Sequence, residues 1–378
     1  MIVYIVTFAL SLLGVKMADL WFDDQRRFLA GSILAVLPPI LIAGLRDSTV
    51  GSDMELYIVP IFNGIASNGQ NLIEFIDSYP DMEIGYLFVN YVIAQLTDQP
   101  FFLLICIHVL IIIPLYIAAM KWREHLSPVL FMFIFYMFFF QESLSIVRQS
   151  IALSFSMLAF TFFWEKKYTR YFLFMIIAFL FHQTAVIALS LPLAYLMVDR
   201  FSIREYYYYY IGIALVIALF FLSLDNILIW MIENDYIDLK FLKYTSADNT
   251  FTPVLGTTNL AVKIVTIAYF VYIMIINKAD TILKLFLVVA VLDMLFSLCA
   301  LIMQPLDRIS LYFRLVSCIS IPYAIYNYPI LFDDDDVPYT RPIIGLFGLL
   351  LFAYWFYVYM LGNYDDTADY QISSTLFI

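Results

Sequence analysis

Ionisable side chains that stand inside or at the edge of long apolar segments are the first candidates for chemistry in this chain. Each such charge costs about 2.5–3.5 kcal/mol on membrane-insertion scales, so its retention suggests a function. Guanidinium groups suit phosphate or diphosphate oxygens, carboxylates suit a hydroxyl that must lose a proton, and histidine can serve as base, acid or phosphate partner. The candidates are Arg46, Asp53, Glu83, Glu142, Arg148, His182, Asp293, Asp307, Arg308 and Arg314.

The spacing of two pairs suggests a shared cavity. Arg308 and Arg314 are six residues apart, which places them about 120° apart around a helix, so they can flank one ligand without stacking. Glu142 and Arg148 have the same separation, starting at the polar break Gln141-Glu142-Ser143. Arginines around such a cavity predict an anionic ligand.

The polar run 46–53 begins where a long apolar segment stops. Gly51 allows a tight turn with positive φ, and Ser52 or Asp53 can cap a following helix. Tyr57 then falls one turn after Asp53 on the face of that helix. The run is therefore either one wall of a membrane site or an ordinary loop and cap between two spans.

Other candidates also have structural interpretations. Glu142 can cap the helix that contains Arg148 or pair with that arginine. His182 can be a hydrogen-bonding residue at a helix turn. Arg308 can form an interfacial salt bridge with Asp307.

Composition defines the class of protein in which these residues act. The chain has 378 residues, of which 63% are hydrophobic and only 13% charged. Soluble domains carry about 25% charged residues, so this is a polytopic membrane protein. The near-continuous apolar runs indicate helices, because barrel strands would alternate polar and apolar residues. We expect an all-α protein forming one integral membrane domain over 1–378.

The apolar runs predict twelve spans. They cover 2–20, 28–45, 101–120, 127–142, 145–164, 171–183, 184–198, 205–222, 259–277, 281–303, 308–329 and 342–361. Lysine and arginine in short loops mark the cytoplasmic side. They gather at Arg26-Arg27, Lys121 and Arg123, Lys166-Lys167-Arg170, Arg200 and Arg204, and Lys278 and Lys284.

This basic pattern places both termini outside the cytoplasm. The 46–83 loop with its motif, the 223–258 loop and the acidic tail 362–378 are then outer segments. Apart from Asp293, which we expect to be a single carboxylate hydrogen-bonded to a neighbouring span, every candidate falls toward the outer end of its segment. The sequence therefore predicts one outward-facing polar site.

Two segments do not fit simple spans. Residues 84–96 are apolar, but a full crossing would move Lys121 to the outside, so we expect a partial or re-entrant helix there. Residues 171–198 are too many for one span. Basic residues at both ends favour two short helices with His182 near the outer tip between them.

Several partners and cofactors are disfavoured. The net charge of −11 and the lack of a basic stripe argue against nucleic acid. We expect Cys106, Cys299 and Cys318 to be packing residues, since they lie inside apolar segments without the spacing of metal ligands. The acidic run Asp333–Asp336 is expected to be solvated. No metal site and no cofactor is predicted.

An ordered set of short motifs resembles the EpsG family of bacterial exopolysaccharide and O-antigen polymerases, which are Wzy-like membrane proteins. Ser52 stands where threonine is expected, and it keeps the hydroxyl. The motifs are Arg46-Asp47-x-x-Val50-Gly51-Ser52-Asp53-x-x-x-Tyr57, Glu83-x-Gly85-Tyr86-x-x-x-Asn90, Arg148-Gln149-x-x-Ala152, the isolated His182, and Arg308-x-x-x-Tyr312-Phe313-Arg314.

The resemblance implies a metal-independent glycosyltransferase of the GT-C type in the bacterial cytoplasmic membrane. Its donor would be a polyprenyl diphosphate-linked oligosaccharide repeat and its acceptor another lipid-linked repeat, both held among membrane lipid. Reaction at the outer face would lengthen the glycan and release polyprenyl diphosphate. A chain-length regulator protein is a further partner that such a polymerase allows.

The clustering of the candidates suggests their roles. We expect Arg148, Arg308 and Arg314 to hold the donor diphosphate, as the electrostatics of a charged leaving group require. Either Asp53 or Glu83 accepts the proton of the acceptor hydroxyl, with His182 as the competing base. The remaining substrate-binding candidates, which position sugars or line the site, are Arg46, Tyr57 and Glu142.

Two other functions use the same residues. An O-antigen ligase-like transferase shares the donor but uses a different acceptor. A transporter or flippase of an anionic lipid-linked sugar would bind the diphosphate without chemistry. Transporters often show inverted repeats and paired broken helices, and the absence of a convincing repeat in this sequence favours an enzyme.

Overall fold

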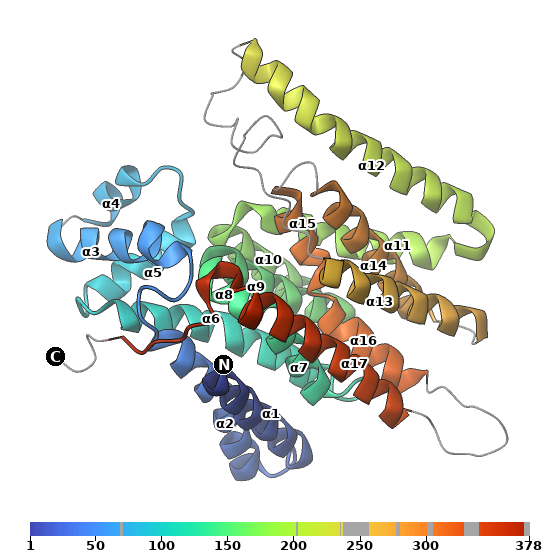
Figure 1. Cartoon of the computed structure of the whole chain (residues 1–378), viewed down its shortest axis with the longest axis horizontal. Coiled ribbons are helices and arrows are strands. Elements are labelled where there is room, and N and C mark those ends of the chain that lie inside the picture. The colour runs from blue at the N-terminus through green and yellow to red at the C-terminus, as the bar shows by residue number, and fades with distance from the viewer. Residues whose placement is uncertain are drawn as a thin grey trace. The chain divides into compact units, whose positions relative to one another are not determined.

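The computed structural model describes residues 1–68, 71–201, 203–234, 236, 257–276, 280–300, 305–328 and 340–373. These residues are helical with connecting turns, and the β-structure among them is one isolated bridge between Arg46 and Ile372. The chain divides into two compact units, unit 1 with residues 1–186 and 325–378, and unit 2 with residues 187–324. Figure 1 labels the helices of both units.

Six helices in the described part of the chain are long and apolar enough to cross a membrane. Shorter apolar helices accompany them, so the chain is a helical membrane protein, while the count of twelve spans and the GT-C type stay predictions. The six are Ile2–Leu20, Gln25–Gly44, Pro100–Lys121, Thr281–Cys299, Leu306–Asn327 and Pro342–Leu361.

Unit 1 is built on long helices that pack side by side. The N-terminal helices α1 and α2 form a hairpin, and α2 packs on α6, which packs on α9. Helix α10 covers another side of α9. Asp24 caps α2 by accepting hydrogen bonds from the main-chain N–H groups of Arg26 and Arg27. The bounds are α1 Ile2–Leu20, α2 Gln25–Gly44, α6 Pro100–Lys121, α9 Val147–Trp164 and α10 Tyr168–Phe181.

The polar break at Gln141–Ser143 interrupts the predicted spans 127–142 and 145–164. Helix α7 covers Pro128–Phe138, and the short α8 covers Phe140–Ser145 before α9 begins at Val147. Between the two predicted spans the break therefore gives a separate six-residue helix, which is buried throughout.

Short helices fill the predicted 46–83 loop and the segment after it. They are the π-helix η1 Met54–Ile58, α3 Val59–Asn68, α4 Leu72–Ser78 and α5 Ile84–Ala94. Helix α5 has 11 residues, a length of about 16 Å at 1.5 Å per residue. It is too short to cross a hydrocarbon layer of about 30 Å alone, which agrees with a partial helix at 84–96.

The chain breaks at His182 as the sequence predicted. Helix α10 ends at Phe181, and a 3₁₀-helix η2 Gln183–Leu189 leads into α11 Ser190–Arg200. His182 itself is extended, with φ −160° and ψ 125°.

The end of the chain returns to unit 1. Helix α17 covers Thr340–Trp355, and the π-helix η4 Phe356–Leu361 continues it. Residues 363–373 belong to the segment that the sequence predicted to be an outer acidic tail, and they make main-chain hydrogen bonds to residues 45–52. Residues 374–378 lie outside the described residues.

Unit 2 contains α11, α12, α13, α14 and α15, and α16 reaches from it into unit 1. Helix α12 continues to Glu233, so the first part of the predicted 223–258 loop is helical. Residues 237–256, Lys278 and Asp333–Asp336 lie outside the described residues. The bounds are α12 Ile203–Glu233, α13 Thr257–Ile276, α14 Thr281–Cys299, α15 Pro305–Arg314 and α16 Ser317–Asn327.

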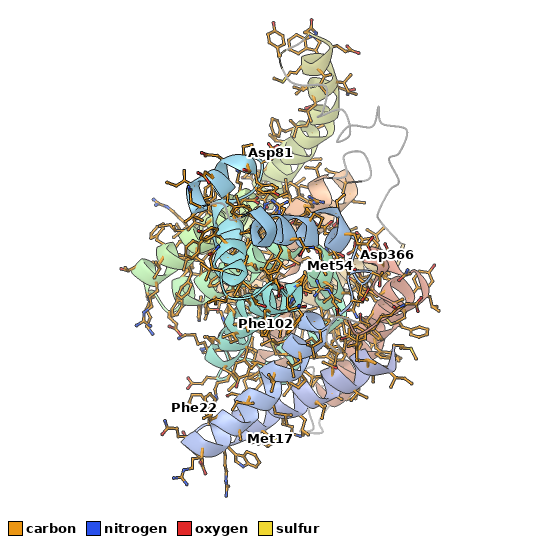
Figure 2. All side chains as sticks on the ribbon, turned by 90° about the vertical axis from the view of Figure 1, so that its left-hand side faces the viewer. Met17, Phe22, Met54, Asp81, Phe102 and Asp366 are labelled. Carbon is orange, nitrogen blue, oxygen red and sulfur yellow. The ribbon has the colours of Figure 1, made fainter. Side chains whose placement is uncertain are left out.

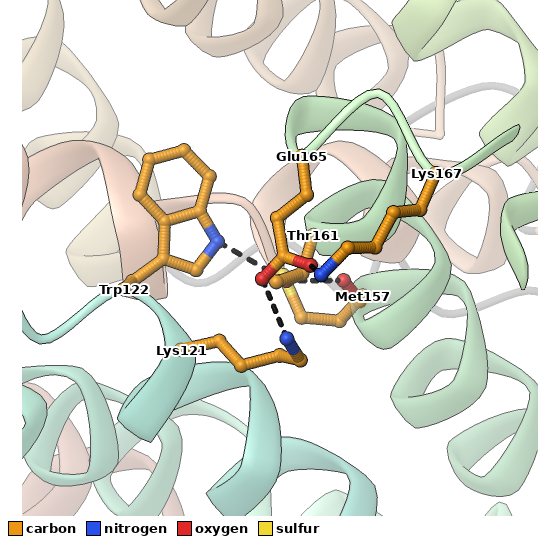
Figure 3. Close-up of polar contacts among 6 residues, drawn as sticks. All are labelled: Lys121, Trp122, Met157, Thr161, Glu165 and Lys167. Carbon is orange, nitrogen blue, oxygen red and sulfur yellow. Dashed lines mark hydrogen bonds and ion pairs between the residues drawn. The ribbon is translucent and has the colours of Figure 1, made fainter.

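The predicted inner and outer segments of unit 1 lie at opposite ends of this unit (Figure 2). Figure 2 shows Phe22, in the turn between α1 and α2, and Asp81, in the predicted outer segment, at opposite ends of the unit. Figure 3 shows the far end of α9, where Glu165 pairs with Lys121 at 2.5 Å and with Lys167 at 2.8 Å. These lysines belong to clusters that the basic rule assigned to the cytoplasm.

Candidate functional site

Glu83 joins three segments that are far apart in the sequence. Its Oε1 lies 2.6 Å from Nδ1 of His182, and its Oε2 forms an ion pair with Arg148. The side chains are largely buried, with exposed fractions of 9% for Glu83, 17% for His182 and 21% for Arg148. We call these three residues the Glu83 cluster.

The ends of three helices place the members of this cluster. Glu83 is the N-cap residue of α5, Arg148 is the second residue of α9, and His182 directly follows α10. Side chains at helix ends can point along the helix axis into a shared space, whereas side chains in the helix interior point sideways. Three helices that end near one another thus bring an acid, a guanidinium and an imidazole together.

Gly85 permits the close approach of α5 to α10. A Cβ atom at this position would lie 2.7 Å from the main-chain oxygen of Leu180, which is a clash with rigid backbone. Leu180 is two residues before His182. The absence of a side chain at Gly85 therefore sets the distance between Glu83 and His182.

Two tyrosine rings pack against the guanidinium of Arg148. Its Cζ lies 5.0 Å from the ring centroid of Tyr57 and 6.0 Å from that of Tyr86, and the two rings meet edge to face. Cation–π contacts of this length stabilise the charge and fix the orientation of the group. The Nε of Arg148 is buried without a hydrogen-bond partner among the described residues, so one donor of the guanidinium is not satisfied there.

Arg148 and His182 keep Glu83 ionised. Burial raises the pKa of Glu83, but the hydrogen bond from His182 and the charge of Arg148 outweigh it and lower the pKa to about 2. A carboxylate with so low a pKa is a weak base at neutral pH. It suits a different task, which is to hold Nδ1–H of His182 and leave Nε2 free to accept a proton.

The motif loop, residues 45–53, leads from α2 to η1. Gly51 has the positive φ that the sequence predicted, at 106°, and its Cα faces the main-chain oxygen of Leu144. Asp53 is the N-cap residue of η1, but its side chain makes no capping hydrogen bond, contrary to our expectation. It lies beside the Glu83 cluster, close enough for its charge to act on Tyr57 and Tyr86.

Arg46 serves the loop itself. It is 1% exposed, and its guanidinium donates hydrogen bonds to the main-chain oxygens of Ala43, Val50 and Leu144. These bonds occupy the donors that a sugar would need. We therefore revise the expected role of Arg46 from positioning sugars to holding the motif loop in place.

Glu142 is buried in α8 and accepts a hydrogen bond of 3.3 Å from the hydroxyl of Tyr359. The sequence offered Glu142 as an ion-pair partner for Arg148. The partner that the structure gives Arg148 is Glu83, from a motif 65 residues away. Sequence spacing alone favours near neighbours and could not identify this pair.

Unit 2 carries its own charged residues. Arg308 is exposed and Arg314 is buried, both on α15. Asp293 pairs with Lys263 of α13 at 2.7 Å, which confirms the expected bond to a neighbouring span. Lys263 also donates to Ser297. We overlooked Lys263, although a lysine inside the apolar run 259–277 meets the criterion used for the other candidates.

The described residues contain no group of three or more His, Cys, Asp or Glu side chains arranged to hold a metal ion. The Glu83 cluster contributes one carboxylate and one imidazole, and its third member is a cation. Cys106, Cys299 and Cys318 are free thiols.

Comparison with protein-family models matched the EpsG family over residues 31–372. This range includes every motif described above. Comparisons with curated proteins and with solved structures gave no match.

Proposed function

The chain belongs to the EpsG family, and from this premise we propose that it polymerises lipid-linked oligosaccharide repeats into a surface polysaccharide. The donor is a repeat on polyprenyl diphosphate and the acceptor is a second lipid-linked repeat. The reaction takes place at the outer face of the bacterial cytoplasmic membrane, and it needs neither a metal ion nor another cofactor.

The Glu83 cluster is the observation that carries this proposal. It combines a fixed guanidinium, an imidazole with an oriented proton and a carboxylate that stays ionised, at the ends of helices in a membrane protein. A lipid-linked donor needs such a site, because its tail stays among the spans while its diphosphate requires a cation at their ends.

In the proposed reaction, the acceptor hydroxyl attacks the anomeric carbon of the donor sugar. A new C–O glycosidic bond forms, and the bond between the anomeric carbon and the diphosphate oxygen breaks. Nε2 of His182 takes the hydroxyl proton, and Glu83 stabilises the imidazolium that results. The bonding electrons leave with polyprenyl diphosphate, whose developing charge Arg148 stabilises.

This assignment chooses among the three bases that the sequence left open. The pKa of about 2 makes Glu83 the orienting group and not the base. Asp53 and Tyr57 border the cluster from η1 and bind sugar hydroxyls in this proposal. Glu142 supports the site through Tyr359. Arg308 and Arg314 of unit 2 remain proposed diphosphate ligands on the basis of their sequence pattern.

The test is a reaction with purified protein in detergent and one defined lipid-linked repeat, run with and without a chelator. We expect a ladder of products and one polyprenyl diphosphate released for each linkage formed, at the same rate in both conditions. A single transfer without a ladder indicates the ligase-like transferase. Binding of the donor without any diphosphate release contradicts the proposal and favours a transporter or flippase.

A further inference from the structure

The segment 363–373, which we call the C-terminal strap, lies against the motif loop. Main-chain hydrogen bonds join the strap to the beginning of the loop. Asp47 donates to the oxygen of Gln371 and Ser373 donates to that of Leu45, each at 2.9 Å. Figure 2 shows Met54, just after the loop, and Asp366 of the strap on the same flank of unit 1.

The strap also accepts hydrogen bonds from main-chain N–H groups at the tight turn of the loop. Gly51 N–H donates to the main-chain oxygen of Asp366, and Ser52 N–H donates to that of Asp365, both at 3.2 Å. A turn with positive φ points consecutive N–H groups outward, and buried donors of this kind need acceptors. The strap supplies these acceptors, so the conformation of the turn and the position of the strap depend on each other.

Hydrogen bonds to two helices, α1 and α2, fix the strap in this place. The hydroxyl of Tyr4 on α1 donates to the main-chain oxygen of Thr367 at 2.8 Å, and Tyr370 donates to that of Ile42 at 2.9 Å. The rings of Tyr4 and Tyr370 meet edge to face. These are long-range contacts from opposite ends of the chain, and they anchor the strap to the α1–α2 hairpin.

Ser145 of α8 forms hydrogen bonds with both the loop and the strap, and it lies close in sequence to Arg148 of the Glu83 cluster. Its hydroxyl accepts a hydrogen bond from Ser52 N–H at 3.1 Å and donates to the main-chain oxygen of Asp365 at 3.3 Å. Three residues further on, α9 presents Arg148. The loop itself leads into η1, which carries Tyr57 against that arginine.

The strap has a folded conformation of its own. Asn363, Asp365 and Asp366 have positive φ values of 46°, 61° and 53°. The side chain of Asn363 accepts from Ala368 N–H at 2.9 Å and donates to Asp366 at 3.2 Å. Left-handed residues other than glycine cost free energy, so they persist where surrounding contacts hold them.

We propose that the C-terminal strap is a positioning element of the active site. It holds the motif loop, and through η1 it keeps the ring of Tyr57 against Arg148 in the orientation that leaving-group stabilisation requires. This inference rests on the proposed function for its effect on rate, but its structural part, the dependence of the loop on the strap, stands on the hydrogen bonds alone.

The test compares Ser145→Ala with Ser143→Ala in the full-length protein. Both substitutions remove a buried serine hydroxyl from α8. The Ser143 hydroxyl bonds the oxygen of Phe140 within its own helix, whereas that of Ser145 joins loop and strap. A Tyr4→Phe variant, which removes the hydroxyl that bonds Thr367, tests the strap from its other side.

Two measurements are made on each variant. Hydrogen exchange of peptides covering 45–57 reports the loop, and steady-state kinetics on the lipid-linked repeat report kcat and KM separately. For Ser145→Ala and Tyr4→Phe we expect exchange about tenfold faster at Gly51 and Ser52, and kcat about fivefold to tenfold lower, with KM within about twofold of wild type. For Ser143→Ala we expect the exchange rate, kcat and KM of the wild-type protein.

The outcomes distinguish a failure of the strap proposal from a failure of the proposed function. Unchanged exchange in Ser145→Ala and Tyr4→Phe overturns the inference, because the loop then does not depend on the strap. Faster exchange with unchanged kcat also overturns it, since the loop would then be held without consequence for the reaction. If wild-type protein makes no polymer, the proposed function fails, and the exchange data still decide whether the strap holds the loop.

Discussion

Two carboxylates mark the two ends of α9, and each lies between two basic side chains. Glu83 meets Arg148 and His182 at the N-terminal end, and Glu165 meets Lys121 and Lys167 just beyond the C-terminal end. The helix has 18 residues, so the clusters are about 25 Å apart, near the thickness of a hydrocarbon layer of about 30 Å. Both clusters place one carboxylate between two basic side chains, but the chemistry that each cluster allows differs.

Exposure and the type of cation explain the difference. The Glu165 side chain is 25% exposed and that of Lys167 is 49% exposed, while that of Glu83 is 9% exposed. Lysine is a flexible, strongly hydrated point charge, whereas the guanidinium of Arg148 is planar and packed against two rings. Of the two clusters, only the Glu83 cluster contains an imidazole, that of His182, which is a side chain able to act as a general base. The N-terminal end of α9 thus carries a largely buried cluster with an imidazole, and the C-terminal end carries a partly exposed cluster of lysines and a carboxylate.

Replacing His182 has the largest expected effect. His182→Gln keeps a hydrogen bond to Glu83 but removes the base, so we expect polymerisation to fall about 10²- to 10⁴-fold. The rate is measured as polyprenyl diphosphate released by purified protein. His125, which is near the predicted inner end, gives the control His125→Gln with an unchanged rate. A His182→Gln variant with more than a tenth of the wild-type rate would exclude His182 as the base.

Replacing Glu83 has the next largest effect. Glu83→Gln removes the charge that stabilises the imidazolium and that pairs with Arg148, and we expect a rate about 10²-fold lower. The matched variant at the other end of α9, Glu165→Gln, should change the rate less than about twofold, because partly exposed ion pairs contribute about 0–1 kcal/mol. Equal losses in the two variants would remove the distinction between the clusters.

The pH dependence of stability separates the wild-type protein from Glu83→Gln. The pKa of Glu83 is about 2 in the folded protein against an ordinary value of 4.5, so its stabilisation is present above about pH 4.5 and is lost as pH falls toward 2. We expect the melting temperature of wild type in detergent to fall more between pH 5 and pH 3 than that of Glu83→Gln. Parallel curves would contradict the low pKa.

The smallest effect in this series concerns spacing and not charge. Gly85→Ala places a Cβ 2.7 Å from the oxygen of Leu180, so α5 must move away from α10 and carry Glu83 from His182. We expect a rate about tenfold lower with normal membrane insertion. The control is Gly64→Ala, whose Cβ would meet only the end of the Tyr79 side chain. Equal rates for both variants would show that the approach of α5 is not limiting.

Apolar length is the part of the fold that can be predicted from sequence. The segment 2–20 matches α1 in full, and 101–120 matches α6 within one residue. The boundary at His182 could also be predicted, because 171–198 has basic residues at both ends and a length that suits two short helices. These features depend on local composition, which the sequence displays directly.

Long-range pairing could not be predicted in the same way. Arg46 looked like a ligand of the substrate, and only the fold brings the carbonyls of Val50 and Leu144 to its guanidinium. The acidic tail 362–378 was predicted as an outer segment without any contact to the motif loop, since main-chain hydrogen bonds such as that from Asp47 leave no trace in residue type. The pairing of Glu83 with Arg148 of α9, 65 residues away in the sequence, likewise depends on the fold and not on spacing along the chain.

The central claim is that the guanidinium of Arg148 stabilises the leaving diphosphate, and its most direct test is a matched pair of conservative variants. Arg123 also pairs with a carboxylate, Asp19, and packs on an aromatic ring, Phe22. Arg148→Lys and Arg123→Lys therefore remove the same group from similar surroundings at different places in unit 1. The account predicts that diphosphate release falls about 10²- to 10³-fold in Arg148→Lys and stays within about twofold of wild type in Arg123→Lys. Equal rates in the two variants would contradict it.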